Sequence, residues 1–219
     1  MCGRYALHAH PQVIALQFGL AAAPDAAPRY NIAPTAEVLI VRAADGPRAT
    51  AQVRWGLVPR WAKDPSIGTR LNNARAETVA EKPAFRDAYR GRRCLVPASG
   101  FYEWKSEAGR KQPYYVYPAS GELFAFAGLW ERWHGPQGPL ETCVIVTTDA
   151  NERMQPIHDR MPVIVAPADY ARWLDLRSGA EPAALLHPCD PEAIAIRRVS
   201  RAVNNARSDS PRLIEAVEG

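Results

Sequence analysis

The chain has 219 residues, 47% of them hydrophobic and 23% charged, with a formal net charge of +4. This length and composition predict one globular domain over residues 1–219, with a core that needs no disulfide bonds. The chain shows no apolar run long enough to span a bilayer and no signal peptide, so we expect a cytoplasmic protein without a membrane partner. The modest excess of basic residues is compatible with nucleic-acid binding but does not require it.

Helices are expected to be short and strands to dominate. Helix start and stop signals predict helices at 11–18, 74–80, 83–89, 167–176, 181–186 and 211–217. Apolar alternation and turn residues predict strands at 37–42, 50–58, 94–97, 101–105, 114–117, 123–130, 142–148, 163–166 and 195–199. This order predicts an α+β fold, with mainly antiparallel, curved sheets that form a partly closed barrel flanked by short helices.

A cysteine directly follows the initiator methionine. Removal of Met1 would leave Cys2 with an α-amino group and a thiol on the same residue, an arrangement that traps aldehydes as a five-membered thiazolidine ring. Judged by its position alone, Cys2 is better explained as part of a frayed terminus. The other cysteines, Cys94, Cys143 and Cys189, have no metal-ligand spacing, so we expect no metal and no cofactor.

Four polar residues interrupt apolar or strand-like segments, namely Asn73, Arg75, Glu103 and His158. Asn73 is explained most simply as a helix cap, and Glu103, between two aromatic residues, as a solvent-facing strand residue. If Glu103 faces inward, burial raises its pKa and makes it a candidate acid or base. His158 lies in a polar cluster with Asp159 and Arg160 that a core does not need. Together with Cys2, these residues supply a nucleophile, an acid/base, a proton carrier and an orienting amide.

Basic and aromatic residues accompany these candidates. Arg4, Arg75 and Arg160 each lie close in sequence to a candidate catalytic residue, and guanidinium groups suit phosphate. Trp61 lies in a proline-bounded loop, where an exposed indole could stack on a base. The alternative, that Trp61 folds back onto the core, is about equally favoured.

Eight motifs, in order along the chain, resemble one family. They are Met-Cys-Gly-Arg-Tyr (1–5), Arg-Tyr-Asn-Ile-Ala-Pro-Thr (29–35), Trp-Gly-Leu-Val-Pro-Arg-Trp (55–61), Asn-Ala-Arg-Ala-Glu-Thr (73–78), Cys-Leu-Val-Pro-Ala-Ser-Gly-Phe-Tyr-Glu-Trp (94–104), Phe-Ala-Gly-Leu-Trp-Glu (126–131), Ile-His-Asp-Arg-Met-Pro (157–162) and Val-Ser-Arg-Ala-Val-Asn (199–204). They resemble the SOS-response-associated peptidases (SRAP), which are abasic-site processing proteins.

The resemblance implies binding of abasic sites in single-stranded DNA, including those at single-strand/duplex junctions, and a thiazolidine DNA–protein crosslink through Cys2. The crosslink would shield the lesion during the DNA damage response. Glu103 would be the acid/base, His158 would assist ring opening, and Asn73 would orient Cys2. The resemblance also implies strand cleavage of the lyase type, and self-processing that removes Met1.

The same resemblance implies a set of DNA contacts, made by a protein expected to be monomeric and to associate with the nucleoid when bound. The residues are Arg4, Pro34, Trp61, Arg75, Thr147 and Arg160. One departure concerns the loop that parts the DNA. Some bacterial members carry a second aromatic residue directly after the first, whereas here Trp61 is followed by Ala62. This puts in doubt how strongly the loop blocks a duplex beside the lesion.

Two other functions remain open from the residues. A peptidase or amidohydrolase could use Cys2 as an N-terminal nucleophile, but it would need an oxyanion hole that the sequence does not identify. A non-catalytic reader of modified DNA would use Trp61 and the arginines, and its salt-sensitive binding would survive Cys2→Ala.

Overall fold

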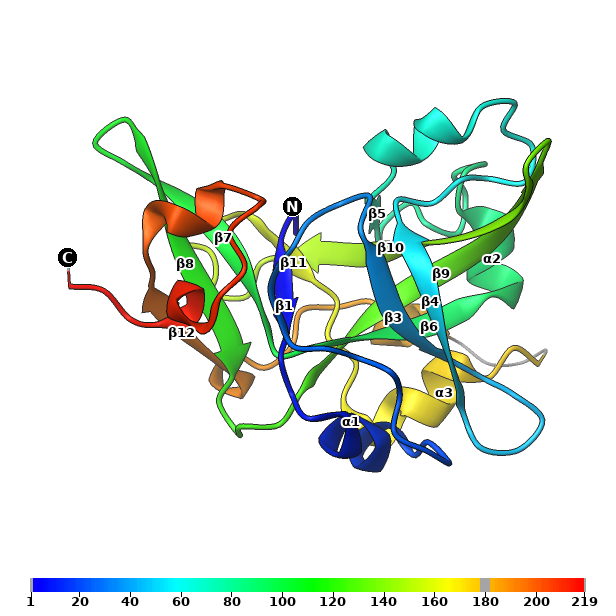
Figure 1. Ribbon diagram of the computed structural model, residues 1–219, viewed down its shortest axis with the longest axis horizontal. Coiled ribbons are helices and arrows are strands. Elements are labelled where there is room, and N and C mark those ends of the chain that lie inside the picture. Colours follow the sequence, from blue (N-terminus) through cyan, green and yellow to red (C-terminus); the bar gives the residue numbers. More distant parts are fainter. Residues whose placement is uncertain (1, 178–181, 219) are drawn as a thin grey trace.

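The computed structural model describes residues 2–177 and 182–218. Figure 1 shows two groups of strands side by side. Strand β1 belongs to the smaller group and lies on the side that faces the larger one, around which short helices are arranged. Most of the chain's regular structure is strand, and the helices are short. The α+β class is therefore confirmed.

The larger group is a closed barrel. Its strands are β3 (Glu37–Arg42), β4 (Ala49–Trp55), β6 (Arg93–Ala98), β9 (Phe124–Gly135) and β10 (Gly138–Asp149). The strands follow the order β10–β4–β3–β6–β9, and the barrel closes because β9 also pairs with β10. Among the five pairs of neighbouring strands in this barrel, only β4 and β10 are parallel. The predicted barrel is confirmed, and its closure is complete. Closure removes the unpaired edges that an open sheet would present.

The smaller group is an antiparallel sheet in the order β12–β8–β7–β1–β2. Its strands are β1 (Tyr5–Leu7), β2 (Arg29–Ile32), β7 (Gly100–Glu107), β8 (Arg110–Pro118) and β12 (Ile194–Arg198). The sequence did not predict β1 or β2, which are three and four residues long. Strand β1 pairs with β7 through Tyr5 and Phe101, so the N-terminus is fixed within the sheet.

Two short strands that the sequence did not predict flank β10. Strand β5 (Asn73–Arg75) pairs in parallel with Ile145–Thr147, so the helix predicted at 74–80 is wrong. Strand β11 (Arg160–Pro162) pairs with Thr147–Asp149. The strand predicted at 163–166 is also wrong, because beyond β11 only an isolated bridge joins Ile164 to Phe126. The first error arises because β10, far along the chain, supplies the hydrogen bonds of β5, whereas residues 163–165 contact β9 through single bonds such as Val165 N to Ala125 O and form no regular ladder.

Helices lie around the strands. Helix α1 (Pro11–Phe18) agrees with the prediction: the His10 side chain caps its start, and Gly19, at φ 63°, ends it in the left-handed conformation. Helix α2 (Arg86–Gly91) begins and ends later than the helix predicted at 83–89, and α3 (Tyr170–Leu174) covers part of the helix predicted at 167–176. The helix predicted at 211–217 is only a short 3₁₀ turn. The remaining helices are 3₁₀ turns, namely Pro65–Arg70, Pro167–Asp169, Pro182–Leu185, Pro191–Ala193, Arg201–Asn204 and Pro211–Ile214. The predicted helix at 181–186 begins at a residue outside the described ranges.

Aromatic packing joins the two groups of strands. The Tyr5 ring of β1 meets Trp55 and Phe126 of the barrel edge-on, with centroids 5.4 and 6.0 Å apart. All three side chains are fully buried. Edge-on aromatic pairs add to the burial of apolar area, so the chain just after Cys2 is held firmly. Within the described ranges, no helix is long and apolar enough to cross a membrane.

Candidate active site

The N-terminal cysteine is buried. Cys2 has no exposed surface, and the next residues are fixed by β1 and by a hydrogen bond from Tyr102 N to Arg4 O (2.9 Å). The interpretation of Cys2 as part of a frayed terminus is therefore wrong. Burial, together with the nearby Glu103 carboxylate, raises the pKa of the Cys2 thiol far above its ordinary value. The thiol is therefore protonated at neutral pH.

Asn73 holds the cysteine backbone. Its side-chain Nδ2 donates to the Cys2 carbonyl oxygen at 2.8 Å, from the first residue of β5. Asn73 begins a strand, so its predicted role as a helix cap is wrong. Its Oδ1 is buried and has no hydrogen-bond partner among the residues that the structure describes. This amide oxygen is therefore a candidate acceptor for an N–H of the cysteine amine.

Glu103 faces inward from β7. Only 3% of its surface is exposed, so the interpretation as a solvent-facing strand residue is wrong. Desolvation by burial raises the pKa of Glu103 to about 7. Near neutral pH both the carboxylic acid and the carboxylate are populated, as a group that gives and takes protons requires.

His158 approaches Glu103 from the turn before β11. Its Nε2 lies 4.0 Å from Glu103 Oε2, and burial lowers the pKa of His158, so the ring is neutral at pH 7. Its Nδ1 accepts from Arg160 N at 2.9 Å, which places the ring proton on Nε2, the nitrogen nearer Glu103. Asp159 Oδ1 lies 3.0 Å from the same Nδ1 and favours the opposite tautomer. The backbone contact outweighs it because the Asp159 side chain is 88% exposed and solvated.

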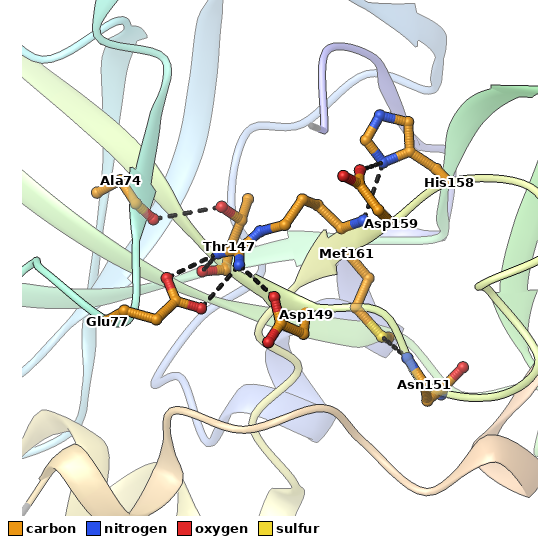
Figure 2. A network of polar contacts seen from close by, with 9 residues as sticks. Ala74, Glu77, Thr147, Asp149, Asn151, His158, Asp159 and Met161 are labelled. Atoms are coloured by element: carbon orange, nitrogen blue, oxygen red, sulfur yellow. Dashed lines mark hydrogen bonds and ion pairs between the residues drawn. The ribbon is translucent and has the colours of Figure 1, made fainter.

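Two of the predicted DNA-binding arginines already have protein partners. Arg4 Nη1 donates to Asn31 Oδ1 at 2.7 Å and to Val203 O at 2.8 Å. Arg160 pairs with the carboxylates of Glu77 and Asp149, both of which are labelled in Figure 2. Arg75 is exposed. A role of Arg4 or Arg160 in phosphate binding remains a prediction, and it would require sharing or exchanging these partners.

The other predicted DNA contacts differ in accessibility. Trp61 is 58% exposed in the loop after β4, so the alternative of a core position is wrong. Its Nε1 donates to Pro83 O at 3.3 Å. Pro34 is half-buried beside Thr35, which has an uncommon positive φ of 74°. Thr147 is fully buried, with its hydroxyl directed at Ala74 O at 3.4 Å, so contact with DNA through this side chain would require the site to open.

Two acidic residues that the sequence did not single out complete the surroundings. Glu77 and Asp149 both pair with Arg160, at 2.7 and 2.6 Å. Glu77 lies inside one of the motifs quoted above, which is the only sequence signal for it. In the parts of the chain that the structure describes, no group of three or more His, Cys, Asp or Glu residues could hold a metal ion.

The whole site falls within a region that matches one family model. The model is described as SOS response associated peptidase (SRAP) and matches residues 1–206. The chain belongs to the SRAP family. The resemblance drawn from the motifs is thus confirmed.

Relatives of this SRAP chain carry names that refer to abasic sites. Abasic site processing protein YoqW of Bacillus subtilis (strain 168) is 42% identical over 224 residues, 99% of this chain and 100% of YoqW. Abasic site processing protein HMCES of Xenopus tropicalis is 35% identical over 196 residues. The aligned region covers 78% of this chain and 58% of the longer HMCES protein. A crystal structure of a protein from Bacteroides thetaiotaomicron has a TM-score of 0.91 at 28% identity, covering 99% of this chain and 100% of its own.

The site of this SRAP protein thus combines a buried sulfur, an amide that holds its backbone, and a carboxyl group that titrates near neutrality. These groups come from the chain just before β1, from β5 and β7, and from the turn before β11. The arrangement suits proton transfer around a nucleophile at the chain terminus.

Proposed function

We propose that this chain processes abasic sites in single-stranded DNA and links itself covalently to them through Cys2. The observation that carries the proposal is the burial of Cys2, held by Asn73 at 2.8 Å, in the neighbourhood of Glu103. The names of YoqW and HMCES support abasic sites as the substrate. An abasic sugar can open to an aldehyde, which is the partner that an aminothiol traps.

The first step is exposure of the amine. While Met1 is present, the nitrogen of Cys2 is a peptide nitrogen and is not a nucleophile. Removal of Met1, by an aminopeptidase or by self-processing, frees the amine. Because the thiol has a raised pKa and is protonated, the amine attacks first. The new C–N bond forms at the aldehyde carbon, and the Asn73 amide oxygen would orient the amine by accepting one of its hydrogens.

Glu103 would move the protons. In its acid form it protonates the oxygen that leaves as water, giving a protonated imine between Cys2 and the sugar. As a carboxylate it then takes the thiol proton, and the sulfur adds to the imine carbon while the nitrogen keeps its hydrogen and becomes neutral, which leaves Glu103 in its acid form again. The balance is one amine, one thiol and one aldehyde converted to one thiazolidine and one water. A pKa of about 7 permits both roles of Glu103 without a large change in pH.

His158 would assist sugar ring opening. Its Nε2–H points toward the Glu103 side of the site, so it can donate to the sugar or to a phosphate. The imine also offers a route to strand cleavage of the lyase type, which competes with ring closure. The exposed Arg75 and Trp61 would contact the DNA, and Trp61 would stack on a base or mark a duplex junction. We propose a monomer that acts in the cytoplasm and on the nucleoid.

A denaturing gel with an abasic single-stranded oligonucleotide tests this function. The wild-type protein is expected to give a shifted band, which Cys2→Ala removes. Cys189→Ala is the matched control, because Cys189 is half-buried, lines a different pocket with Phe124 and Val165, and should leave the band unchanged. The absence of a Cys2-dependent band would refute the proposal. Mass spectrometry of the same samples reports whether Met1 is present and whether the sugar is attached to Cys2.

The family description keeps a peptidase function in view, with Cys2 as the nucleophile. Turnover of a peptide at a rate unaffected by abasic DNA would favour it over the crosslinking function.

A further inference from the structure

The Arg160 guanidinium joins its own segment to two others, which carry the residues labelled Glu77, Thr147 and Asp149 in Figure 2. Its nitrogens donate to Glu77 Oε1 at 2.7 Å and Oε2 at 3.0 Å, to Asp149 Oδ1 at 2.6 Å and to the Thr147 carbonyl oxygen at 2.8 Å. The Arg160 side chain is only 14% exposed. A guanidinium bound by both oxygens of one carboxylate and also by a second carboxylate is fixed in orientation as well as in position.

Each of these segments carries or contacts a part of the site. Glu77 lies in the turn directly after β5, the strand that begins with Asn73. The turn is also tied to β10, because Ala76 N donates to the same Thr147 carbonyl oxygen at 2.8 Å. Arg160 begins β11, and its backbone N donates to His158 Nδ1. The Arg160 guanidinium therefore links the segment that holds Cys2 to the segment that orients His158.

The charges around Arg160 do not favour phosphate. One guanidinium faces two carboxylates, so the three side chains together carry a charge of −1. A phosphate oxygen that approaches Arg160 meets this negative charge and must compete with Glu77 for the same nitrogens. The Arg160 contact lowers the pKa of Glu77, which keeps Glu77 ionised at neutral pH. Glu77 thus strengthens the internal contact and weakens attraction of DNA.

We propose that Glu77 is a positioning residue. Glu77 holds Arg160 in place, and the backbone N–H of Arg160 then keeps the His158 ring with its Nε2–H toward Glu103. The same contact lowers the affinity of the protein for the DNA backbone. The part of this inference that concerns reaction rate rests on the proposed function. The part that concerns the His158 ring does not, because the contacts are present without DNA.

The test is Glu77→Gln, which keeps the size of the side chain and removes its charge. We expect two effects of opposite sign. The limiting rate of crosslinking at saturating abasic DNA falls by about fivefold or more, the effect of weakening one charge-assisted hydrogen bond. Affinity for single-stranded DNA, measured in a Cys2→Ala background so that no crosslink forms, rises by about twofold or more at low salt.

Glu81→Gln is the matched control. Glu81 lies four residues further along the same turn region, is exposed, and loses the same charge on substitution. It should leave the limiting rate unchanged. Two results would contradict the proposal. In one, Glu77→Gln weakens DNA binding as well as slowing the reaction. In the other, Glu77→Gln changes the DNA affinity and the limiting rate no more than Glu81→Gln does. Thermal unfolding of each variant shows whether the fold is intact.

Nitrogen NMR of the His158 ring gives a readout that is independent of DNA. In the wild-type protein we expect one signal typical of an acceptor Nδ1 and one typical of a protonated Nε2. In Glu77→Gln these signals should move toward a mixture of tautomers, whereas Glu81→Gln should retain the wild-type pattern. An unchanged pattern in Glu77→Gln would overturn the inference. If the wild-type protein forms no crosslink at all, the proposed function fails while this measurement still decides the role of Glu77.

Discussion

Replacement of Glu103 by glutamine is expected to stabilise the protein at high pH while it slows the chemistry. Burial raises the pKa of Glu103 from 4.5 to about 7, so the folded protein binds this proton more tightly than the unfolded chain does. Stability of the wild-type protein therefore falls as the pH rises from about 4.5 to about 7, and the loss is complete above that range. Glutamine does not titrate and removes this dependence.

The magnitude follows from the two pKa values. Each unit of difference is worth about 1.4 kcal/mol, so the ionised carboxylate costs the folded state about 3 kcal/mol at pH 8 and almost nothing at pH 4. The free energy of unfolding of Glu103→Gln, relative to wild type, should thus rise by about 3 kcal/mol between those pH values. For a chain of this length, that is a rise in relative Tm of roughly 6–12 °C.

Urea unfolding at pH 4 and at pH 8 measures this difference. Both proteins must carry the same N-terminus, which mass spectrometry establishes, because the N-terminal charge lowers the pKa of Glu103 and opposes the effect of burial. Glu81→Gln is the control, because it removes the same functional group from an exposed position. A stability difference between wild type and Glu103→Gln that is independent of pH would refute the assignment of a raised pKa to Glu103.

The Glu103→Gln variant should also form the crosslink about 10²- to 10⁴-fold more slowly at neutral pH. An unchanged rate would assign the acid/base role to His158 instead.

Three further substitutions test the packing and the DNA surface. Gly100→Ala would place a Cβ 2.5 Å from the Val116 carbonyl oxygen of the neighbouring strand, so chemical unfolding should show a loss of about 1–3 kcal/mol. Glu131→Ala leaves the mostly buried Arg92 without its partner at 2.7 Å and should cost roughly 3 kcal/mol by the same measurement. Trp61→Ala, at a 58% exposed position, should change stability by less than about 1 kcal/mol, yet weaken binding of single-stranded DNA about fivefold or more by fluorescence anisotropy.

Strands with a clear apolar alternation were predicted well from the sequence. The predicted strand at 37–42 agrees with β3 at both ends, and 142–148 lies within β10. Strands β1, β2, β5 and β11 were not predicted, because three or four residues are too few to show a period. The segment after Asn73 has helix-favouring residues, but its backbone pairs with β10, some seventy residues away. Local preference is weak compared with a complete set of strand hydrogen bonds.

The sequence by itself determined which chemical groups are available and to which family the chain belongs. It placed an aminothiol precursor at Cys2 and named Asn73, Glu103 and His158, with their roles implied by the resemblance. Only the tertiary structure decided that Cys2 is buried, that Glu103 faces inward with a pKa near neutrality, and that Arg160 is held by Glu77 and Asp149. The reason is that burial and charge pairing depend on neighbours from distant parts of the chain, which residue type and spacing do not specify.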